Sequence, residues 1–243
     1  MFFTRKRSSG PANFEWLQTD MHSHLIPGID DGSPDIATSI ELIKGFQTLG
    51  YKKIITTPHI LWQIYPNTTD KIVSGQAELN SALKENGIDM EIQAAAEYFI
   101  DEYFVELLEN KTPLLKISGN MVLVEISMVT LPMDLQDIIF EMQMQDYQPV
   151  IAHPERYVYL TRNKDFFGRL RDAGCLFQLN LLSLTGHYGS QVKDLAEYLL
   201  KNEFYGLAGT DLHNRGHMDA LQKMNPSIIR KLQDYGRWRN SEL

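Results

Sequence analysis

The sequence predicts one α/β domain built on a parallel sheet of about seven strands that closes into a barrel. Strand-like apolar runs alternate with amphipathic helical patterns along most of the 243 residues, which is the pattern of a parallel sheet wrapped by helices. Histidine and acidic side chains also occur near the C-terminal ends of these runs. In a parallel barrel such ends converge on one face, where barrel enzymes keep their sites.

The first strand ends in a loop rich in groups that bind metals or carry protons, TDMHSHLIPGIDDG, residues 19–32. His22 and His24 are two residues apart, so they project from the same face of a strand and form a chelating pair. The next helix is predicted in GSPDIATSIELIKGFQTLG, where Ser33 suits the N-cap and Gly50 the stop. Its apolar residues recur at helical spacing, so this helix covers one side of the sheet.

The same unit of strand, loop and helix recurs along the rest of the chain. The further strand-like runs read KKIITTPH, EIQAAAEYFI, MVLVEIS, PVIAHPERY, CLFQLNLLS and YGLAGTDLH, with helical patterns such as LQDIIFEMQMQDY and VKDLAEYLLKNEF between them. An open doubly wound sheet would collect polar residues from fewer strands, so this distribution favours a closed ring. No G-x-G-x-x-G loop follows any run, which removes the main support for a dinucleotide-binding domain.

Composition limits the classes of partner and compartment. The 23 basic and 31 acidic residues give a net charge of −8, which argues against a protein that binds nucleic acid through its phosphates. The single cysteine, Cys175, excludes an internal disulfide and suits a reducing compartment. No apolar run of about 18 residues and no signal-peptide pattern occurs, so we expect a cytoplasmic protein without a transmembrane segment. The oligomeric state stays open.

Residues 1–16 are expected to form an N-terminal tail, and residues 17–243 the folded domain. The tail carries a basic cluster, Arg5 to Arg7, beside a tract of Ser, Gly and Pro. Such a cluster is more often a solvated tail than a contact with an anionic membrane or an acidic partner.

Nine side chains near the strand ends form a candidate metal centre: His22, His24, Asp31, His59, Glu97, Glu125, His153, Asp211 and His213. Five imidazoles and four carboxylates exceed the three protein ligands of one catalytic zinc ion, so the set predicts two or three metal ions. Mixed histidine and carboxylate ligands suit Mn, Fe or Zn. The other two histidines, His187 and His217, match no ligand pattern and are expected on the surface.

Six motifs in order, DMHSHLIPGIDDG, TTPH, AAAEYF, VEIS, IAHPERY and GTDLHN, resemble the PHP (polymerase and histidinol phosphatase) superfamily, in particular its bacterial capsule-type, or CpsB-type, protein-tyrosine phosphatases. The resemblance implies a distorted (β/α)7 TIM-like barrel with three divalent metal ions, Mn²⁺ first and Fe or Zn as alternatives. It also implies how the ligands are shared: His22, His24 and Asp211 hold one metal, Glu97 bridges it to a second held with Glu125 and His153, and Asp31, His59 and His213 hold the third.

The resemblance further implies a metal-dependent protein-tyrosine phosphatase whose partner is a phosphotyrosine protein, a bacterial tyrosine kinase of exopolysaccharide and capsule regulation. In such an enzyme a metal-bridged hydroxide attacks phosphorus in line. Arg156 matches the arginine that meets the substrate phosphate. Arg215 is the candidate for a second phosphate contact, although the segment around it departs from the family's usual Pro-containing continuation. Asp31 matches the family ligand rather than Asp30, which we expect to be a turn residue.

Other interpretations stay open from the sequence. The chain could be a phosphoesterase for a small ester such as histidinol phosphate, or a non-catalytic, metal-containing module that binds a kinase. An amidohydrolase barrel commonly uses a carboxylated lysine where this chain has Glu125, so that alternative is weaker. A cysteine-dependent tyrosine phosphatase is dismissed, because it needs an arginine six residues after its cysteine, where Leu181 stands. The loop over residues 60–70 carries Trp62 and Tyr65, which either stack on a substrate ring or pack on the barrel rim.

Overall fold

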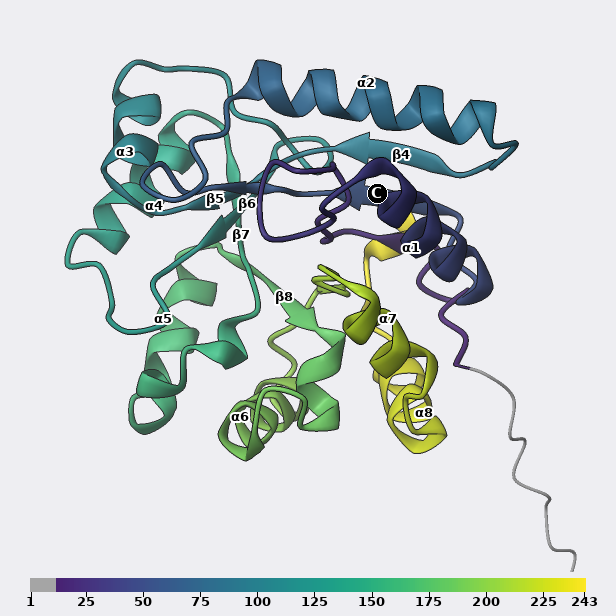
Figure 1. Ribbon diagram of the computed structural model, residues 1–243. Helices are drawn as coiled ribbons and strands as arrows, with labels where there is room; N and C mark the ends of the chain where they lie inside the picture. Colours follow the sequence, from purple (N-terminus) through teal and green to yellow (C-terminus); the bar gives the residue numbers. More distant parts are fainter. Residues whose placement is uncertain (1–11) are drawn as a thin grey trace, which may run out of the picture.

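The computed structural model of the protein describes residues 12–243, whose strands form a curled parallel sheet (Figure 1). The strands are hydrogen-bonded in two orders, β1-β2-β4 and β3-β5-β6-β7-β8-β9, and these pairings are parallel. The strands are β1 (Thr19–Asp20), β2 (Lys53–Thr56), β3 (His59–Ile60), β4 (Glu91–Ala94), β5 (Glu97–Phe99), β6 (Met121–Glu125), β7 (Gln148–Ile151), β8 (Leu176–Asn180) and β9 (Leu207–Gly209). The predicted parallel α/β architecture is confirmed, with more and shorter strands than the sequence suggests.

Two of the predicted strands are each broken into two pieces. A Thr-Pro pair ending at Pro58 separates β2 from β3, and a proline has no N–H to donate to a sheet. Two alanines beginning at Ala95 separate β4 from β5, directly beside the break between β2 and β3. Hydrogen bonds continue across both breaks, because Ala95 N donates to Thr56 O at 2.9 Å and Glu97 N donates to Pro58 O at 3.1 Å. The two sheets are therefore consecutive parts of one curved surface.

The segments that follow the first and the last strand lie side by side. Asp211 N donates to His22 O at 2.8 Å, and His24 N donates to Leu212 O at 2.9 Å. These hydrogen bonds join two parts of the chain that are almost two hundred residues apart in sequence. They hold His22 and His24 at the C-terminal ends of the strands.

In the described part of the chain, eight α-helices pack around the sheet (Figure 1). They are α1 (Ile36–Thr48), α2 (Thr69–Glu85), α3 (Glu102–Glu109), α4 (Leu135–Met144), α5 (Asp165–Asp172), α6 (Ser190–Lys201), α7 (Arg215–Gln222) and α8 (Pro226–Tyr235). Short 3₁₀ helices follow β7 and β8, at Pro154–Arg156, Val158–Arg162 and Leu181–Thr185, and one ends the chain at Asn240–Glu242. Figure 1 shows α2 lying along β4, and most other helices connect one strand to the next.

The N-cap of α1 differs from the prediction. Asp35, not Ser33, caps the helix, since its side chain accepts a hydrogen bond from Thr38 N at 2.7 Å. The Ser33 hydroxyl is buried and donates instead to Asp35 O at 3.0 Å. The predicted stop is confirmed, because the helix ends at Thr48 and Gly50 follows with a φ of 90°, a conformation that favours glycine.

Apolar side chains fill both faces of the sheet. Neighbouring residues of β6 belong to different clusters: Val122 and Val124 join the large core under the helices. Leu123 joins a smaller cluster with residues of other strands, including Ile55 and Val150. Successive side chains of a strand point to opposite faces, so the smaller cluster lies inside the curve of the sheet. A sheet buried on both faces explains why its strands read as continuous apolar runs.

Of the expected N-terminal tail, residues 1–11, with the basic cluster Arg5 to Arg7, lie outside the described residues. Residues 12–16 pack against the domain. Phe14 is fully buried, and its N–H donates to Leu49 O at 2.7 Å. Across residues 12–243, no helix combines the length and the apolar character needed to cross a membrane.

Candidate metal centre

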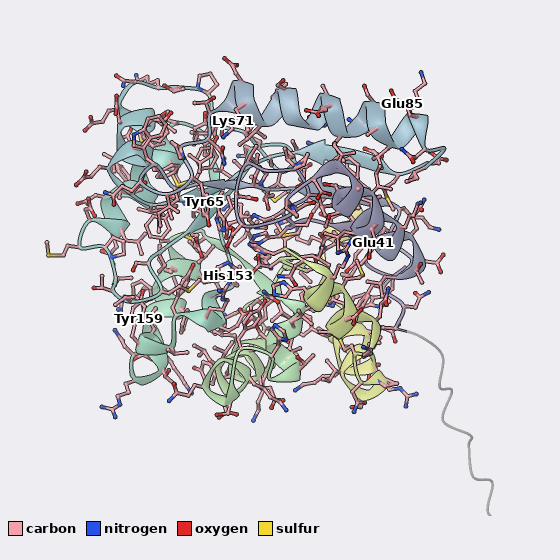
Figure 2. The ribbon with its side chains drawn as sticks, in the orientation of Figure 1. Glu41, Tyr65, Lys71, Glu85, His153 and Tyr159 are labelled. Atoms are coloured by element: carbon pink, nitrogen blue, oxygen red, sulfur yellow. The ribbon has the colours of Figure 1, made fainter. Side chains whose placement is uncertain are left out.

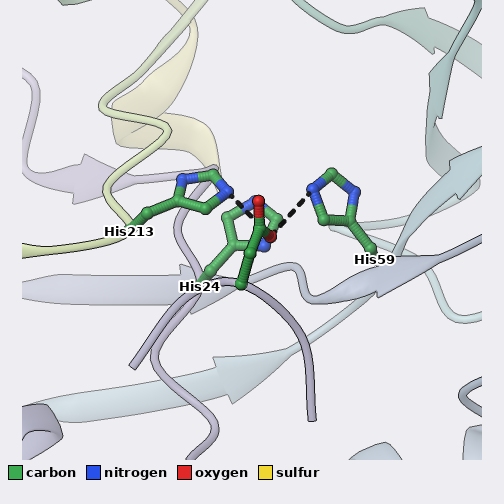
Figure 3. A group of neighbouring side chains, drawn as sticks. His24, His59 and His213 are labelled. Atoms are coloured by element: carbon green, nitrogen blue, oxygen red, sulfur yellow. Dashed lines mark ion pairs between the residues drawn. The ribbon is translucent and has the colours of Figure 1, made fainter. Parts of the chain in front are cut away.

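The nine side chains that the sequence places near strand ends lie together in the structure. Their nitrogen and oxygen atoms form four overlapping groups, and within each group the atoms lie within 4.8 Å of one another. The groups are His24, Asp31, His59 and His213; His22, His24 and Asp211; His22, Glu97 and His153; and His59, Glu97 and Glu125. Figure 3 shows three histidines of the first group, whose rings approach one region from three different segments.

Glu97, at the start of β5, stands at the centre of the cluster and is fully buried. Its Oε2 lies 3.2 Å from Nε2 of His22 and 3.0 Å from Nδ1 of His59. Its Oε1 lies 3.0 Å from Nε2 of His153. Burial raises the pKa of the Glu97 carboxyl, but the imidazoles of His22 and His59 outweigh it and hold this pKa well below its usual range. A carboxylate with two oxygens that face different imidazoles is placed as a bridging ligand would be.

Three buried carboxylates lie close together in the cluster. Glu97, Glu125 and Asp211 are all buried, and burial together with the Glu97 carboxylate raises the pKa of Glu125 to about 8. Glu97 Oε2 and Nδ1 of His59 are buried and make no well-directed hydrogen bond with any described residue. Imidazole and carboxylate donors are the ligands that Mn, Fe and Zn accept. The residues therefore fit divalent cations, which would neutralise the carboxylates and occupy these free donor atoms.

Asp30 has a different role from the turn residue that we expected. Its Oδ2 accepts hydrogen bonds from Nδ1 of His24 at 2.8 Å and from His59 N at 3.0 Å, and its Oδ1 accepts one from Gly32 N at 3.0 Å. Burial raises the pKa of Asp30, but the His24 imidazole lowers it well below its ordinary value. A hydrogen bond to Nδ1 leaves Nε2 of His24 free for a metal, the usual task of a carboxylate behind a ligand histidine. Asp31 lies further out, with its side chain 53% exposed and its Oδ1 3.4 Å from Nε2 of His213.

Gln178 of β8 was not identified from the sequence. Its Oε1 lies 3.0 Å from Nδ1 of His22 and accepts a hydrogen bond from His153 N at 3.2 Å. The Nδ1–H tautomer of His22 leaves Nε2 directed at Glu97 and Asp211. The available signal was a polar residue two positions before Asn180 in an apolar run, because residues two apart share one face of a strand.

The backbone around the centre is tightly constrained. His153 and Asp211 have φ values of 29° and 49°, a region that residues with side chains rarely adopt and that is found at functional sites. Two glycines lie where a side chain has no room. A Cβ on Gly32 would lie 2.4 Å from His24 Cβ, and one on Gly209 would lie 2.6 Å from His22 Cβ.

Arg156 lies beside the cluster, in the 3₁₀ helix that follows His153. Its Nη1 donates to Asp211 Oδ2 at 3.0 Å, and its side chain is 28% exposed. The guanidinium carbon lies 4.9 Å from the centroid of the Tyr188 ring. The hydroxyl of that ring accepts a hydrogen bond from Asn180 Nδ2 at 3.1 Å. Arg156 is thus a fixed cation that is open to solvent on one side.

Arg215 contacts a different part of the protein. Its Nε donates to Glu41 Oε1 of α1 at 2.8 Å, and its side chain is 63% exposed. The described residues provide no hydrogen bond or ion pair between Arg215 and the nine cluster residues. A second phosphate contact by Arg215 therefore stays a prediction that requires release of Glu41.

Two histidines and the cysteine lie outside the nine-residue cluster. His187 is exposed, as expected, but His217 is half-buried, with its Nδ1 3.2 Å from Asp211 O. Cys175 is buried, and this burial raises the pKa of its thiol to about 12. A buried thiol of this kind is not a nucleophile.

Comparison with known proteins identifies relatives along most of the chain. A model of the family described as "Capsular polysaccharide synthesis, CpsB/CapC" matches residues 18–237. The chain is 29% identical over 201 residues to the putative tyrosine-protein phosphatase CapC of Staphylococcus aureus, which covers 80% of this chain and 76% of that protein. It is 28% identical over 229 residues to the tyrosine-protein phosphatase CpsB of Streptococcus pneumoniae, covering 92% of this chain and 93% of CpsB.

A solved structure also resembles this chain over most of its length. The chain resembles a crystal structure from work on YwqE of Bacillus subtilis and CpsB of Streptococcus pneumoniae, described as unique metal-dependent tyrosine phosphatases. The TM-score is 0.80 and the sequence identity 25%, over 92% of this chain and 90% of that one.

Proposed function

The chain belongs to the CpsB/CapC family of capsular polysaccharide synthesis, and on this premise we propose that it is a metal-dependent protein-tyrosine phosphatase. The relatives described above are named tyrosine-protein phosphatases, and the similar solved structure is of a metal-dependent type. The observation that carries the proposal is the convergence of nine candidate metal ligands with one arginine, Arg156, beside them.

We propose three divalent cations, Mn²⁺ first and Fe or Zn as alternatives. His22, His24 and Asp211 would hold one, Glu97 would bridge it to a second held with Glu125 and His153, and Asp31, His59 and His213 would hold the third. The close groups formed by His22, His24 and Asp211, and by Asp31, His59 and His213 together with His24, support two of these sites. For the remaining site, Nε2 of His153 lies 3.0 Å from Glu97 Oε1 and 3.6 Å from Glu125 Oε1.

Each residue around the centre has a task in the proposed hydrolysis. Bound cations would activate water as the nucleophile and offset negative charge on the phosphoryl oxygens. Arg156 would bind two phosphoryl oxygens through the parallel N–H donors of its planar guanidinium. Asp30 and Gln178 hold Nδ1 of His24 and His22 and so direct the other nitrogen of each ring inward. The phenolate of tyrosine is a good leaving group, so no strong general acid is required.

We further propose that the strands complete a distorted (β/α)7 barrel and that residues 17–243, with residues 12–16 packed against them, form one domain. The hydrogen bonds between the His22 and Asp211 segments and the inner apolar cluster support the barrel. The proposed substrate protein is a bacterial tyrosine kinase of capsule or exopolysaccharide regulation, in keeping with the family's role in capsular polysaccharide synthesis. A chain with one buried cysteine suits the cytoplasm, where we place it.

Hydrolysis of a phosphotyrosine peptide by the Mn²⁺-loaded protein tests the proposed function. We expect His22→Ala and Asp211→Ala to lower kcat/KM by more than about 100-fold, the upper end for residues that only support ligands. His187→Ala is the matched control, because His187 is an exposed histidine outside the cluster. Full activity in both cluster variants would end the proposal. A higher kcat/KM for histidinol phosphate than for the peptide would instead identify a small-ester phosphatase.

A further inference from the structure

A tight loop after β3 places an aromatic ring against the candidate metal centre. Tyr65 N donates to Leu61 O at 2.7 Å, and Leu61 N donates to Tyr65 O at 3.3 Å. Asn67, which is fully buried, donates through its side-chain amide to His59 O at 2.8 Å and to Ile29 O at 2.9 Å. Backbone and amide hydrogen bonds therefore fix the position of Tyr65 relative to both segments.

The Tyr65 ring lies nearly parallel to the imidazole of His59. The two ring centroids are 5.6 Å apart, and the planes differ by 12°. Tyr65 is only partly buried, and among residues 12–243 His59 is its one aromatic partner. Tyr65 thus contacts a candidate metal ligand, while part of its side chain stays exposed to solvent. Figure 2 labels Tyr65 beside the central region of the molecule that contains His153.

The other tyrosines near the centre are already engaged. Tyr188 lies under the guanidinium of Arg156, and its hydroxyl is hydrogen-bonded to Asn180. The hydroxyls of Tyr157 and Tyr159 donate to backbone carbonyls, at 2.9 Å and 3.0 Å, and Tyr157 is fully buried. Of these four tyrosines, Tyr65 is the one whose hydroxyl has no hydrogen-bond partner among residues 12–243.

We propose that Tyr65 forms an aryl-binding subsite, in which the exposed part of its ring packs against the phenyl ring of the phosphorylated tyrosine. The phenyl ring of such an ester is joined to phosphorus through a single oxygen, so it lies next to the cluster when the phosphate is bound. Tyr65 lies beside the cluster because its ring stacks on His59, whose Nδ1 is 3.0 Å from Glu97 Oε2. Aromatic rings attract one another in offset-stacked or edge-to-face arrangements. The inference rests on the proposed phosphatase function and adds the feature that separates aryl from alkyl phosphate esters.

The same loop supplies a matched control. Trp62 is also aromatic and is 44% exposed, but it stacks on Tyr103 of α3 with a centroid distance of 4.0 Å. Within residues 12–243 its ring contact is with Tyr103 and not with His59 or Tyr65, so Trp62→Leu removes an aromatic ring from the loop without changing the proposed subsite.

The experiment compares p-nitrophenyl phosphate with phosphoserine as substrates of the Mn²⁺-loaded full chain. In Tyr65→Leu we expect KM for p-nitrophenyl phosphate to rise about 3- to 10-fold, the range of one aromatic pair. The kcat/KM for phosphoserine and the bound metal content should stay within about twofold of wild type. Tyr65→Phe, which keeps the ring, and Trp62→Leu should both match wild type for the aryl ester.

Two results would overturn the subsite. The first is an unchanged KM for the aryl ester in Tyr65→Leu. The second is a joint loss of kcat/KM for both substrates and of bound metal, which would mean that Tyr65 only positions His59. If Tyr65→Leu does not fold, inhibition of the wild type decides. Phenylphosphonate should then bind at least about threefold more tightly than methylphosphonate, and equal inhibition would refute the subsite. A wild-type protein that hydrolyses neither these two esters nor a phosphotyrosine peptide with any metal would refute the phosphatase function itself, a different result from loss of aryl preference.

Discussion

Replacing Asp30 by Asn tests whether a buried carboxylate outside the nine candidate ligands sets the strength of metal binding. The Asp30 carboxylate accepts three hydrogen bonds, from Nδ1 of His24, from His59 N and from Gly32 N. An Asn side chain keeps one acceptor oxygen, so at least one of these donors loses its partner, and the negative charge behind His24 is removed. A hydrogen bond to a charged group contributes about 1.5 to 3 kcal/mol. The expected loss in metal affinity is therefore about 10- to 100-fold, which matches the range for partners of ligand histidines.

The assay for Asp30→Asn is a titration of Mn²⁺ into metal-free protein, followed by turnover of a phosphotyrosine peptide. We expect the Mn²⁺ concentration for half-maximal activity to rise about 10- to 100-fold, with kcat near wild type at saturating metal. Asp35→Asn is the control, because Asp35 lies in the same loop but caps α1. An Asp30→Asn variant with unchanged Mn²⁺ dependence would refute the role of Asp30 as the partner of His24.

Three other changes have expected outcomes. Arg156→Lys should lower kcat/KM about 10- to 100-fold at saturating metal, because a lysine cannot make two parallel hydrogen bonds to a phosphoryl group; activity within twofold of wild type would exclude the guanidinium contact. Gly209→Ala should lower the free energy of unfolding by about 1 to 3 kcal/mol in a urea titration, since its Cβ would lie 2.6 Å from His22 Cβ; an unchanged midpoint would contradict that close approach. Cys175→Ala should keep full activity, and iodoacetamide at pH 8 should modify Cys175 only in unfolded protein, because burial raises the pKa of the thiol from 9.0 to about 12. The stability that the neutral thiol contributes is complete below pH 9 and is lost as the pH rises towards 12. Rapid alkylation of the folded protein at pH 8 would refute the burial of this thiol.

The parallel sheet and the position of the candidate centre could be predicted because both depend on patterns within single strands. Runs such as MVLVE are apolar on both faces and turn polar at Glu125, and parallel strands bring such ends to one edge. The positions at which two of the strands break were harder to predict. Pro58 explains one of them, whereas the break at Ala95 has no signal in the sequence, because alanine does not interrupt a strand by itself.

The residues that hold the histidines in place were harder to predict. Asp30 and Asp31 are adjacent and chemically identical, and only the folded loop directs Asp30 inward to His24 while Asp31 stays half exposed. Gln178 contacts His22 from a strand that is 156 residues away in sequence. Such contacts depend on the register of neighbouring strands, which a strand's own pattern does not specify.

Metal content and turnover measured on one sample test the proposed phosphatase most directly. The freshly purified protein would be analysed for transition metals by mass spectrometry and assayed on a phosphotyrosine peptide before chelation, after chelation and after reloading with Mn²⁺. We predict about three metal ions per chain, matching the proposed sites, with turnover that chelation abolishes and Mn²⁺ restores. One metal ion or none after reloading, or turnover that survives complete metal removal, would contradict the proposed centre.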